Sequence, residues 1–273
     1  MQTGGAIVLR ELREDDIPAI DALITTVFER PGHPQAPPSA APRGEIRYLA
    51  ERDGRIVGFA AARSYGKVAY IGPMAVHPGS RRLGIASDLL QKLIANLESN
   101  GCRTLLLDAT ELGMPLYERF GFVDLDGCQI YERGANECCV IGSVSVDPDA
   151  LVRAIAIDRR IMGCDRSAVL KAFGREPGAW LAVQNDGFVL TRGRVLGPWV
   201  ADSRSAAHEL FEAAIAASPG VDRIFIPHVN DDAPSIVVSA GFRCSRTLRH
   251  MGRGKSSPMQ RARIFGQGSL AHG

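Results

Sequence analysis

Apolar positions alternate between helical and strand-like spacing along the first half of the chain. Helical spacing runs from Ile17 to Val27 and again from Ile85 to Leu97, and strand-like runs separate and follow these segments. The proline-rich stretch from Pro31 to Pro42 holds neither a helix nor a sheet ladder, so it predicts a long loop of the kind that often covers a binding site. The predicted strands are 7–10, 46–51, 56–63, 68–76, 104–107 and 122–131, and the predicted helices are 15–27, 84–97 and 112–120.

The second half repeats this pattern. The segment GFAAARSYGKVAYIGPMAV (58–76) is echoed by GFVLTRGRVLGPWVA (187–201), and LLLDATELGMPLYERFGF (105–122) is echoed by IFIPHVNDDAPSIVVSAGF (224–242). Two echoes in the same order indicate a structural duplication. We therefore predict two domains, 1–135 and 141–273, with helices at 149–161 and 166–173 opening the second copy.

Composition describes an ordinary globular chain and excludes several function classes. The 273 residues carry a net charge of only +2, which argues against a nucleic-acid or membrane partner. The N-terminus lacks the pattern of a signal peptide, and no window has the apolar length of a membrane span, so we expect a cytoplasmic protein. The six cysteines have neither C-x-x-C spacing nor companion histidines, which predicts buried, reduced thiols and no metal site.

The stretch PGSRRLGIASDLL (78–90) carries the clearest chemistry. A strand ends before it and a helix starts within it, so unpaired backbone N–H groups, a helix dipole and two arginines meet at one glycine. Such a junction fits a pyrophosphate. The spacing matches neither a Walker A loop, since no Lys-Ser or Lys-Thr follows Gly84, nor the G-x-G-x-x-G of a dinucleotide fold.

This junction resembles the acyl-CoA pyrophosphate loop of the GNAT superfamily of N-acetyltransferases. Val76, Pro78, Arg81, Gly84 and Ala86 match V-x-P-x-x-R-x-x-G-x-A, and LYERFGF (116–122) looks like the family's L-Y-x-x-x-G-F segment. The resemblance covers about residues 7–131. It implies an α/β (α+β) fold, with a mixed, mostly antiparallel central sheet flanked by helices in each of two GNAT-like domains, and acetyl-CoA as co-substrate.

The resemblance also implies a role for each matching residue. The main chain of Met74, Ala75 and Val76 is expected to face the pantetheine and thioester, and Tyr117 is expected to protonate the departing thiolate. A solvated loop for the arginines and a half-buried helix tyrosine for Tyr117 are the competing interpretations. The residues expected around the pyrophosphate are Arg81, Arg82, Leu83, Gly84, Ile85, Ala86 and Ser87.

The general base is left open by the sequence. A substrate ammonium must lose a proton before it attacks a thioester. Glu29, His33, Asp108 and Glu111 lie on segments that face the central strands, but each also fits a surface or capping role. None of the four is therefore assigned.

The second copy lacks the phosphate-binding features of the first. DSRSAAHELF (202–211) follows its strand without the arginine-glycine loop, Asp202 brings the wrong charge, and an apolar run (236–238) replaces Tyr117. The chain thus resembles tandem GNAT proteins, in which a degenerate second domain shapes the acceptor pocket. His228 and Asn230 are candidate substrate contacts, and a helix-capping turn is their alternative role.

Taken together, the sequence predicts an N-acetyltransferase. It is expected to move an acetyl group from acetyl-CoA to an amine of a small molecule or peptide, by direct attack in a ternary complex and without a metal. The alternatives are a non-catalytic acyl-CoA-binding regulatory module, transfer to a hydroxyl, or a longer acyl donor. The protein is expected to be a monomer or a homodimer.

Overall fold

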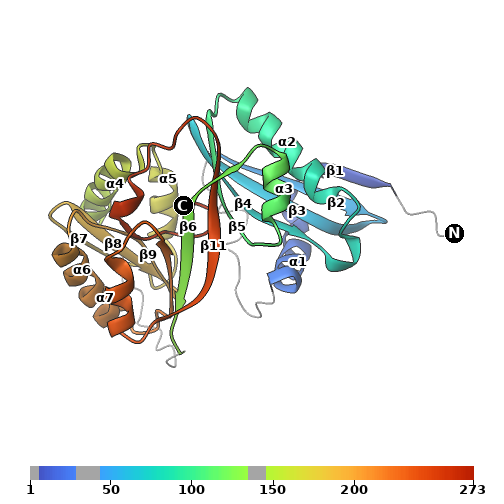
Figure 1. The fold of residues 1–273 in the computed structure, drawn as a ribbon. Coiled ribbons are helices and arrows are strands. Elements are labelled where there is room, and N and C mark those ends of the chain that lie inside the picture. Colours follow the sequence, from blue (N-terminus) through green and yellow to red (C-terminus); the bar gives the residue numbers. More distant parts are fainter. Residues whose placement is uncertain (1–5, 29–43, 135–145) are drawn as a thin grey trace.

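All strands of the described residues join in a single sheet. The structure is a computed structural model that describes residues 6–28, 44–134 and 146–273. Within these residues a 12-stranded sheet runs in the order β1-β2-β3-β4-β5-β11-β6-β10-β9-β8-β7, and β12 pairs with β9 off this path (Figure 1). The chain is therefore a mixed α/β fold built on one continuous, mostly antiparallel sheet.

The first half follows the predicted order of elements. The helix predicted to start at Asp15 or Asp16 is preceded by a short 3-10 helix, η1 (Glu14–Asp16). The remaining elements are β1 (Ile7–Glu11), α1 (Ile17–Phe28), β2 (Glu45–Arg52), β3 (Arg55–Tyr65), β4 (Val68–Val76), η3 (Pro78–Ser80), α2 (Ile85–Ser99), β5 (Thr104–Ala109), α3 (Met114–Arg119) and β6 (Val123–Glu132). The expected loop at 31–42 lies outside the described residues.

Helices α1 and α2 cover opposite faces of this part of the sheet. Ala60 and Ala62 on β3 pack with the apolar stripe of α2, whereas Phe59 and Ala61 pack with α1. This alternation is what a strand buried on both faces requires, since successive side chains point to opposite sides. The α1 face and the α2 face are named accordingly below.

The second half repeats the hairpin of the first down to its irregularities. The β3–β4 ladder has a bulge between Ala60 and Ala62, and the β8–β9 ladder has one between Val189 and Thr191. In both copies the Gly–Pro peptide bond is cis. The elements are α4 (Pro148–Met162), α5 (Ser167–Phe173), β7 (Trp180–Gln184), β8 (Gly187–Arg192), β9 (Val195–Val200), α6 (Arg204–Ala217), β10 (Arg223–Pro227), α7 (Ala233–Ser239), β11 (Arg243–Gly254), η4 (Arg261–Arg263) and β12 (Ile264–Gly266).

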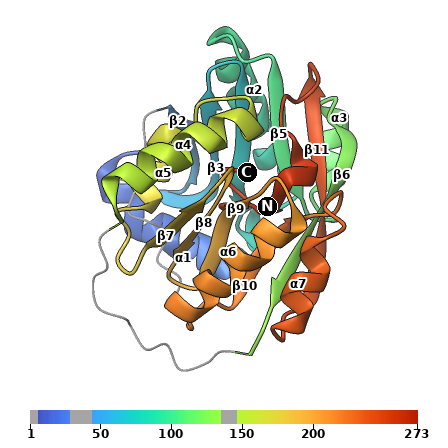
Figure 2. The same ribbon diagram turned by 90° about the vertical axis from the view of Figure 1, so that its left-hand side faces the viewer.

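The two halves exchange their last strands. Strand β11 of the second half lies between β5 and β6 of the first, and β6 in turn pairs with β10 of the second half. Figure 1 shows β6 and β11 side by side at the centre of the view, and in Figure 2 the same two strands lie side by side toward its right-hand edge. Each half of the sheet is therefore completed by a strand from the other half.

An apolar cluster on the α1 face also joins the halves. Tyr70 and Leu106 of the first half are fully buried against residues of α4, α5, β8 and β9 of the second. Among the four described cysteines, Cys102, Cys128 and Cys164 are buried as predicted, but Cys244 is exposed on β11. The prediction of buried thiols is thus wrong for Cys244, because it lies near the start of β11, where the strand is exposed.

Candidate functional site

Strands β4 and β5 pair briefly and then diverge. Within the described residues their parallel ladder runs only from Val68 to Tyr70 on β4 and from Thr104 to Leu106 on β5. Beyond Tyr70 the edge of β4, which carries Met74 and Val76, has no strand partner on its β5 side in the described ranges. We call this gap the first splay; its main-chain donors and acceptors are free to bind an extended ligand arm.

The junction after β4 leaves a helix start without a side-chain cap. Gly84 is the N-cap residue of α2 in the left-handed conformation (φ +84°), and no side chain caps it. Arg82 is also left-handed (φ +62°). Arg81, Arg82, Leu83 and Gly84 are exposed, and in the described part of the chain neither arginine makes an ion pair. The uncapped N–H groups at the start of α2, the helix dipole and the two arginines are the groups that could hold an anion here, and we call this junction the anion cradle.

Tyr117 faces Met74 across the first splay. Its hydroxyl lies 3.9 Å from the Met74 Sδ, and its ring meets Phe122 edge to face at 6.0 Å between centroids. Burial raises the pKa of Tyr117 to about 12, so the phenol keeps its proton at neutral pH. A protonated hydroxyl at this position is suited to donating a proton into the splay.

The corresponding splay of the second half is filled by the chain itself. Strands β9 and β10 pair only at Val195 and Leu196. Beyond that point β12 pairs with β9, and Gln267 forms a bridge with Phe225 of β10. The segment after β12 lies so close to Gly197 that an added Cβ there would clash with the Gln267 carbonyl. No ligand arm can enter between β9 and β10 without displacing this segment.

The start of α6, which corresponds to the start of α2 in the first copy, has a side-chain cap. Ser203 is the N-cap residue of α6, and its hydroxyl accepts a hydrogen bond from the Ala206 N–H. Asp202 lies beside Arg160 and Arg263, both within 3.5 Å. The cradle of the first copy therefore has no counterpart here.

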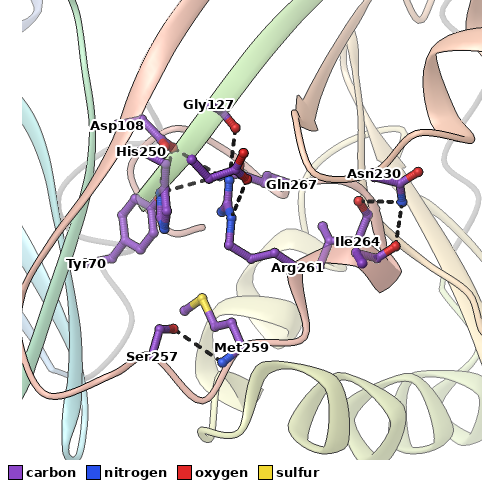
Figure 3. A network of polar contacts seen from close by, with 12 residues as sticks. Tyr70, Asp108, Gly127, Asn230, His250, Ser257, Met259, Arg261, Ile264 and Gln267 are labelled. Atoms are coloured by element: carbon purple, nitrogen blue, oxygen red, sulfur yellow. Dashed lines mark hydrogen bonds and ion pairs between the residues drawn. The ribbon is translucent and has the colours of Figure 1, made fainter. Parts of the chain in front are cut away.

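A buried polar network lies next to the first splay, where both halves contribute side chains (Figure 3). Asp108 on β5 accepts hydrogen bonds from the Tyr70 hydroxyl (2.5 Å) and from Gln267 Nε2 (3.1 Å), and its other oxygen lies 2.9 Å from His250 Nδ1 on β11. The side chains of Asp108 and His250 are both 0 % exposed. Nearby, Arg261 donates to Asp126 (3.1 Å) and to the Gly127 carbonyl (3.1 Å).

Charge in this network is concentrated on Asp108. Burial raises the pKa of Asp108, but hydrogen bonding and attraction from His250, together with Arg261, lower it below its ordinary value overall. Burial and the neighbouring Asp108 charge raise the pKa of Tyr70 well above its ordinary value. Asp108 is therefore an ionised carboxylate held by a protonated phenol.

Sequence reasoning included Asp108 among the base candidates but missed Tyr70, His250 and Gln267. Each of these three residues is a polar residue in an otherwise apolar strand or tail. That feature points to a shared site only once β11 is known to lie beside β5. Of the other base candidates, Glu111 is exposed in the loop before α3. Glu29 and His33 lie outside the described residues.

The candidate substrate residues of the second copy lie on the turn after β10. His228 is exposed beside Gly127, whose carbonyl accepts from the His228 N–H at 2.8 Å. Asn230 is 2 % exposed; its amide donates to the carbonyls of Ala262 and Ile264, and its oxygen accepts from two N–H groups at the start of α7. Asn230 thus serves the capping turn that the sequence also allowed.

Two family profiles match the chain, one in each half. The profile described as "Acetyltransferase (GNAT) family" matches residues 11–122, and that described as "Acetyltransferase (GNAT) domain" matches residues 154–266. In the described residues, no helix has the length and apolarity needed to cross a membrane.

Individual proteins are similar to this chain in structure or in sequence. A Pyrococcus horikoshii protein assigned to the acetyltransferases has a similar structure, with a TM-score of 0.84 and 27% identity over 98% of this chain and 96% of that one. A GCN5-related N-acetyltransferase from Sphaerobacter thermophilus shares the fold, with a TM-score of 0.62 and 17% identity over 93% of this chain and 97% of that one. The glucosamine 6-phosphate N-acetyltransferase of Trypanosoma brucei brucei is 34% identical over 76 residues, which are 25% of this chain and 52% of that enzyme. The chain thus spans about half the length of this curated relative.

Proposed function

The chain belongs to the GNAT acetyltransferase family, with one GNAT domain in each half, and from this membership we propose that it transfers an acetyl group from acetyl-CoA to the amine of a small molecule. The first half is proposed to bind acetyl-CoA, and the second half to complete the acceptor site. The two substrates meet in one ternary complex, and the amine attacks the thioester directly.

The observation that carries this proposal is the contrast between the two splays. Within the described residues, the first has no partner strand along β4 and ends at a helix start that has no side-chain cap and has two arginines without ion pairs. The second is filled by β12 and ends at a helix capped by Ser203. A duplicated fold that keeps one copy open and fills the other supports a single cofactor site, in the first half.

The residues of the first splay fit the chemistry of an acyl-CoA. We assign the pyrophosphate to the backbone N–H groups from Arg82 to Ser87, with the Arg81 guanidinium at the rim. The unpaired edge of β4 at Met74 and Val76 hydrogen-bonds the extended arm, and one N–H polarises the thioester carbonyl. The Tyr117 hydroxyl supplies the proton for the thiolate.

An amino sugar is the first acceptor to test. The curated relative acts on glucosamine 6-phosphate, and it matches part of this chain at 34% identity. The experiment is a thiol-release assay with acetyl-CoA across amino sugars and their phosphates, amino acids, polyamines, aminoglycosides and short peptides. Turnover with one amine class, together with an N-acetylated product by mass spectrometry, is the expected result.

The competing functions give different outcomes in the same assay. An O-acetylated product identifies hydroxyl transfer, and turnover only with propionyl- or longer acyl-CoA identifies another donor. Binding of acetyl-CoA without thiol release from any acceptor identifies a non-catalytic module. Calorimetry is expected to give one acetyl-CoA site per chain, and two equivalent sites would contradict the assignment of the cofactor to the first half alone.

A further inference from the structure

Both oxygens of the Asp108 carboxylate lie within hydrogen-bond distance of neighbouring side chains. One oxygen accepts from Tyr70 and Gln267, and the other faces His250 Nδ1 at 2.9 Å. An ionised carboxylate at this distance holds the proton of a histidine on Nδ1. With the proton on Nδ1, the His250 ring presents Nε2 as an acceptor.

His250 Nε2 has no hydrogen-bond partner among the described residues, although it is fully buried. The Gln267 Oε1 atom of the same network is buried and unpartnered as well. Leaving a buried acceptor unpaired is destabilising, so such atoms usually meet a water or a ligand. Both atoms are acceptors beside a negative charge, which suits an N–H donor.

The position of the pair along the strands places it beside the first splay, on the α1 face. Asp108 lies two residues past the last paired position of β5, about 7 Å beyond it. Met74 lies about 10 Å past the last paired position of β4, because the bulge leaves only three residue steps, from Arg63 to Ala60, on the strand opposite. Asp108 and His250 therefore stand between the closed end of the splay, where Tyr70 lies, and the thioester site proposed at Met74. His250 pairs directly with Asp108 across the β5–β11 ladder.

The fold does not need this polar pair. In the second copy the residue equivalent to Asp108 is Pro227, and it pairs with Cys128. The two splays are thus built on equivalent strands, and only the first carries a carboxylate and an imidazole at these paired positions. A buried ion pair is weak evidence for stability, because desolvation offsets most of its attraction.

We propose that His250 is the proton acceptor for the attacking amine, with Asp108 as its positioning residue and bound water linking His250 Nε2 to the amine. This inference rests on the proposed function. It makes the second half a contributor to the reaction, since His250 comes from β11 and Gln267 from the segment after β12.

These groups account for both protons that the acceptor nitrogen loses. His250 Nε2 takes one proton from the acceptor ammonium, and the nitrogen lone pair then attacks the thioester carbon. The carbon–sulfur bond breaks as the carbon–nitrogen bond forms, and Tyr117 protonates the sulfur. The second proton lost by the nitrogen restores Tyr117 through solvent, and His250 releases its proton to solvent. The net products are the amide, coenzyme A and one proton.

The first test is His250→Gln, with His208→Gln on the exposed face of α6 as the matched control. We expect kcat to fall about 100-fold or more in His250→Gln, with the acetyl-CoA dissociation constant within twofold of the wild type. The acidic limb of the kcat/KM profile should disappear with it. The titratable and charged groups that face His250 are Asp108 on β5, Tyr70 on β4, Asp126 on β6 and Arg261 on η4.

The second test does not depend on activity. Nitrogen-15 NMR of histidine-labelled wild-type protein should show His250 protonated on Nδ1 and bare on Nε2, and Asp108→Asn should switch the tautomer. A proton on Nε2 in the wild type overturns the proposal, as does a His250→Gln variant with unaltered kcat and acidic limb. If the wild type releases no thiol with any amine, the proposed function fails; an active wild type with an unaltered His250→Gln variant overturns only the present inference.

Discussion

Met74 and Trp199 occupy the same position in the two copies of one bulged hairpin, and they have opposite surroundings. Met74 is half-buried beside the Tyr117 hydroxyl at the edge of the first splay. Trp199 is fully buried, with its ring 5.3 Å from that of Phe211 and 5.1 Å from that of Phe265, measured between centroids. The Met74 side chain borders a strand edge without a partner, whereas the Trp199 side chain is enclosed in the apolar core of the second half.

Met74→Trp should therefore close the first splay. The larger ring adds bulk where the arm of acetyl-CoA is proposed to lie, so we expect acetyl-CoA binding to weaken at least tenfold, on the order of 1.4 kcal/mol or more. Met74→Leu conserves volume and serves as the control. Calorimetry measures the acetyl-CoA affinity of both variants. If Met74→Trp binds acetyl-CoA as tightly as the wild type, the arm of acetyl-CoA does not lie along this strand edge.

Gly84→Glu should weaken acetyl-CoA binding by orders of magnitude while the domain remains folded. A carboxylate at the positive end of α2 repels a pyrophosphate, and φ of +84° disfavours any side chain. The nearest atom to an added Cβ is Asp88 Oδ2 at 3.8 Å, so the protein itself has room for it. Gly193→Glu, at φ +50° in an open turn of the second half, carries the same backbone strain and should bind normally. Equal affinities of the two variants would contradict the cradle.

Tyr117→Phe should lower kcat by about 100-fold and leave acetyl-CoA affinity unchanged. The phenyl ring keeps the edge contact with Phe122, and only the proton donor is lost. Because burial raises the pKa of Tyr117 to about 12, no loss of rate through its ionisation is expected below about pH 10 in the wild type. Steady-state kinetics at saturating substrates checks both statements, with Tyr131→Phe on β6 as the control. Unchanged turnover would refute the proton-donor role.

Folding stability should fall as the pH drops below about 6.5, partly through His272. Burial, followed by repulsion from Arg63, Arg192 and Arg166, lowers the pKa of His272 well below its ordinary value. Below the pKa of the unfolded state, the His272 side chain of the unfolded chain binds a proton that the folded chain does not bind. The contribution of His272 to folding stability is therefore present above that pKa and is lost below it, by at most about 1.4 kcal/mol per pH unit. Urea unfolding at pH 7.5, 6 and 5 measures the slope. His272→Gln should flatten it, and an identical slope in that variant would exclude His272 as the cause.

Local signals in the sequence predicted much of the fold and part of the site. Strand-like apolar runs identified β3, β4 and β5, helical spacing identified α1 and α2, and the Gly84 junction followed from the residues themselves. These features depend on neighbours close in the chain, where periodicity and turn chemistry act. The echo between residues 58–76 and 187–201 likewise predicted the duplication, which the matching bulges confirm.

The tertiary structure alone decided which strands meet. Nothing in the local pattern places β11 between β5 and β6, since strand pairing over more than a hundred residues is set by packing of the whole sheet. That placement brings His250 to Asp108, and the placement of β12 fills the second splay. The sequence by itself determined the elements, the duplication and the position of the helix start at Gly84. Only the fold decided which copy stays open and which residues surround it, because those contacts join segments that are distant along the chain.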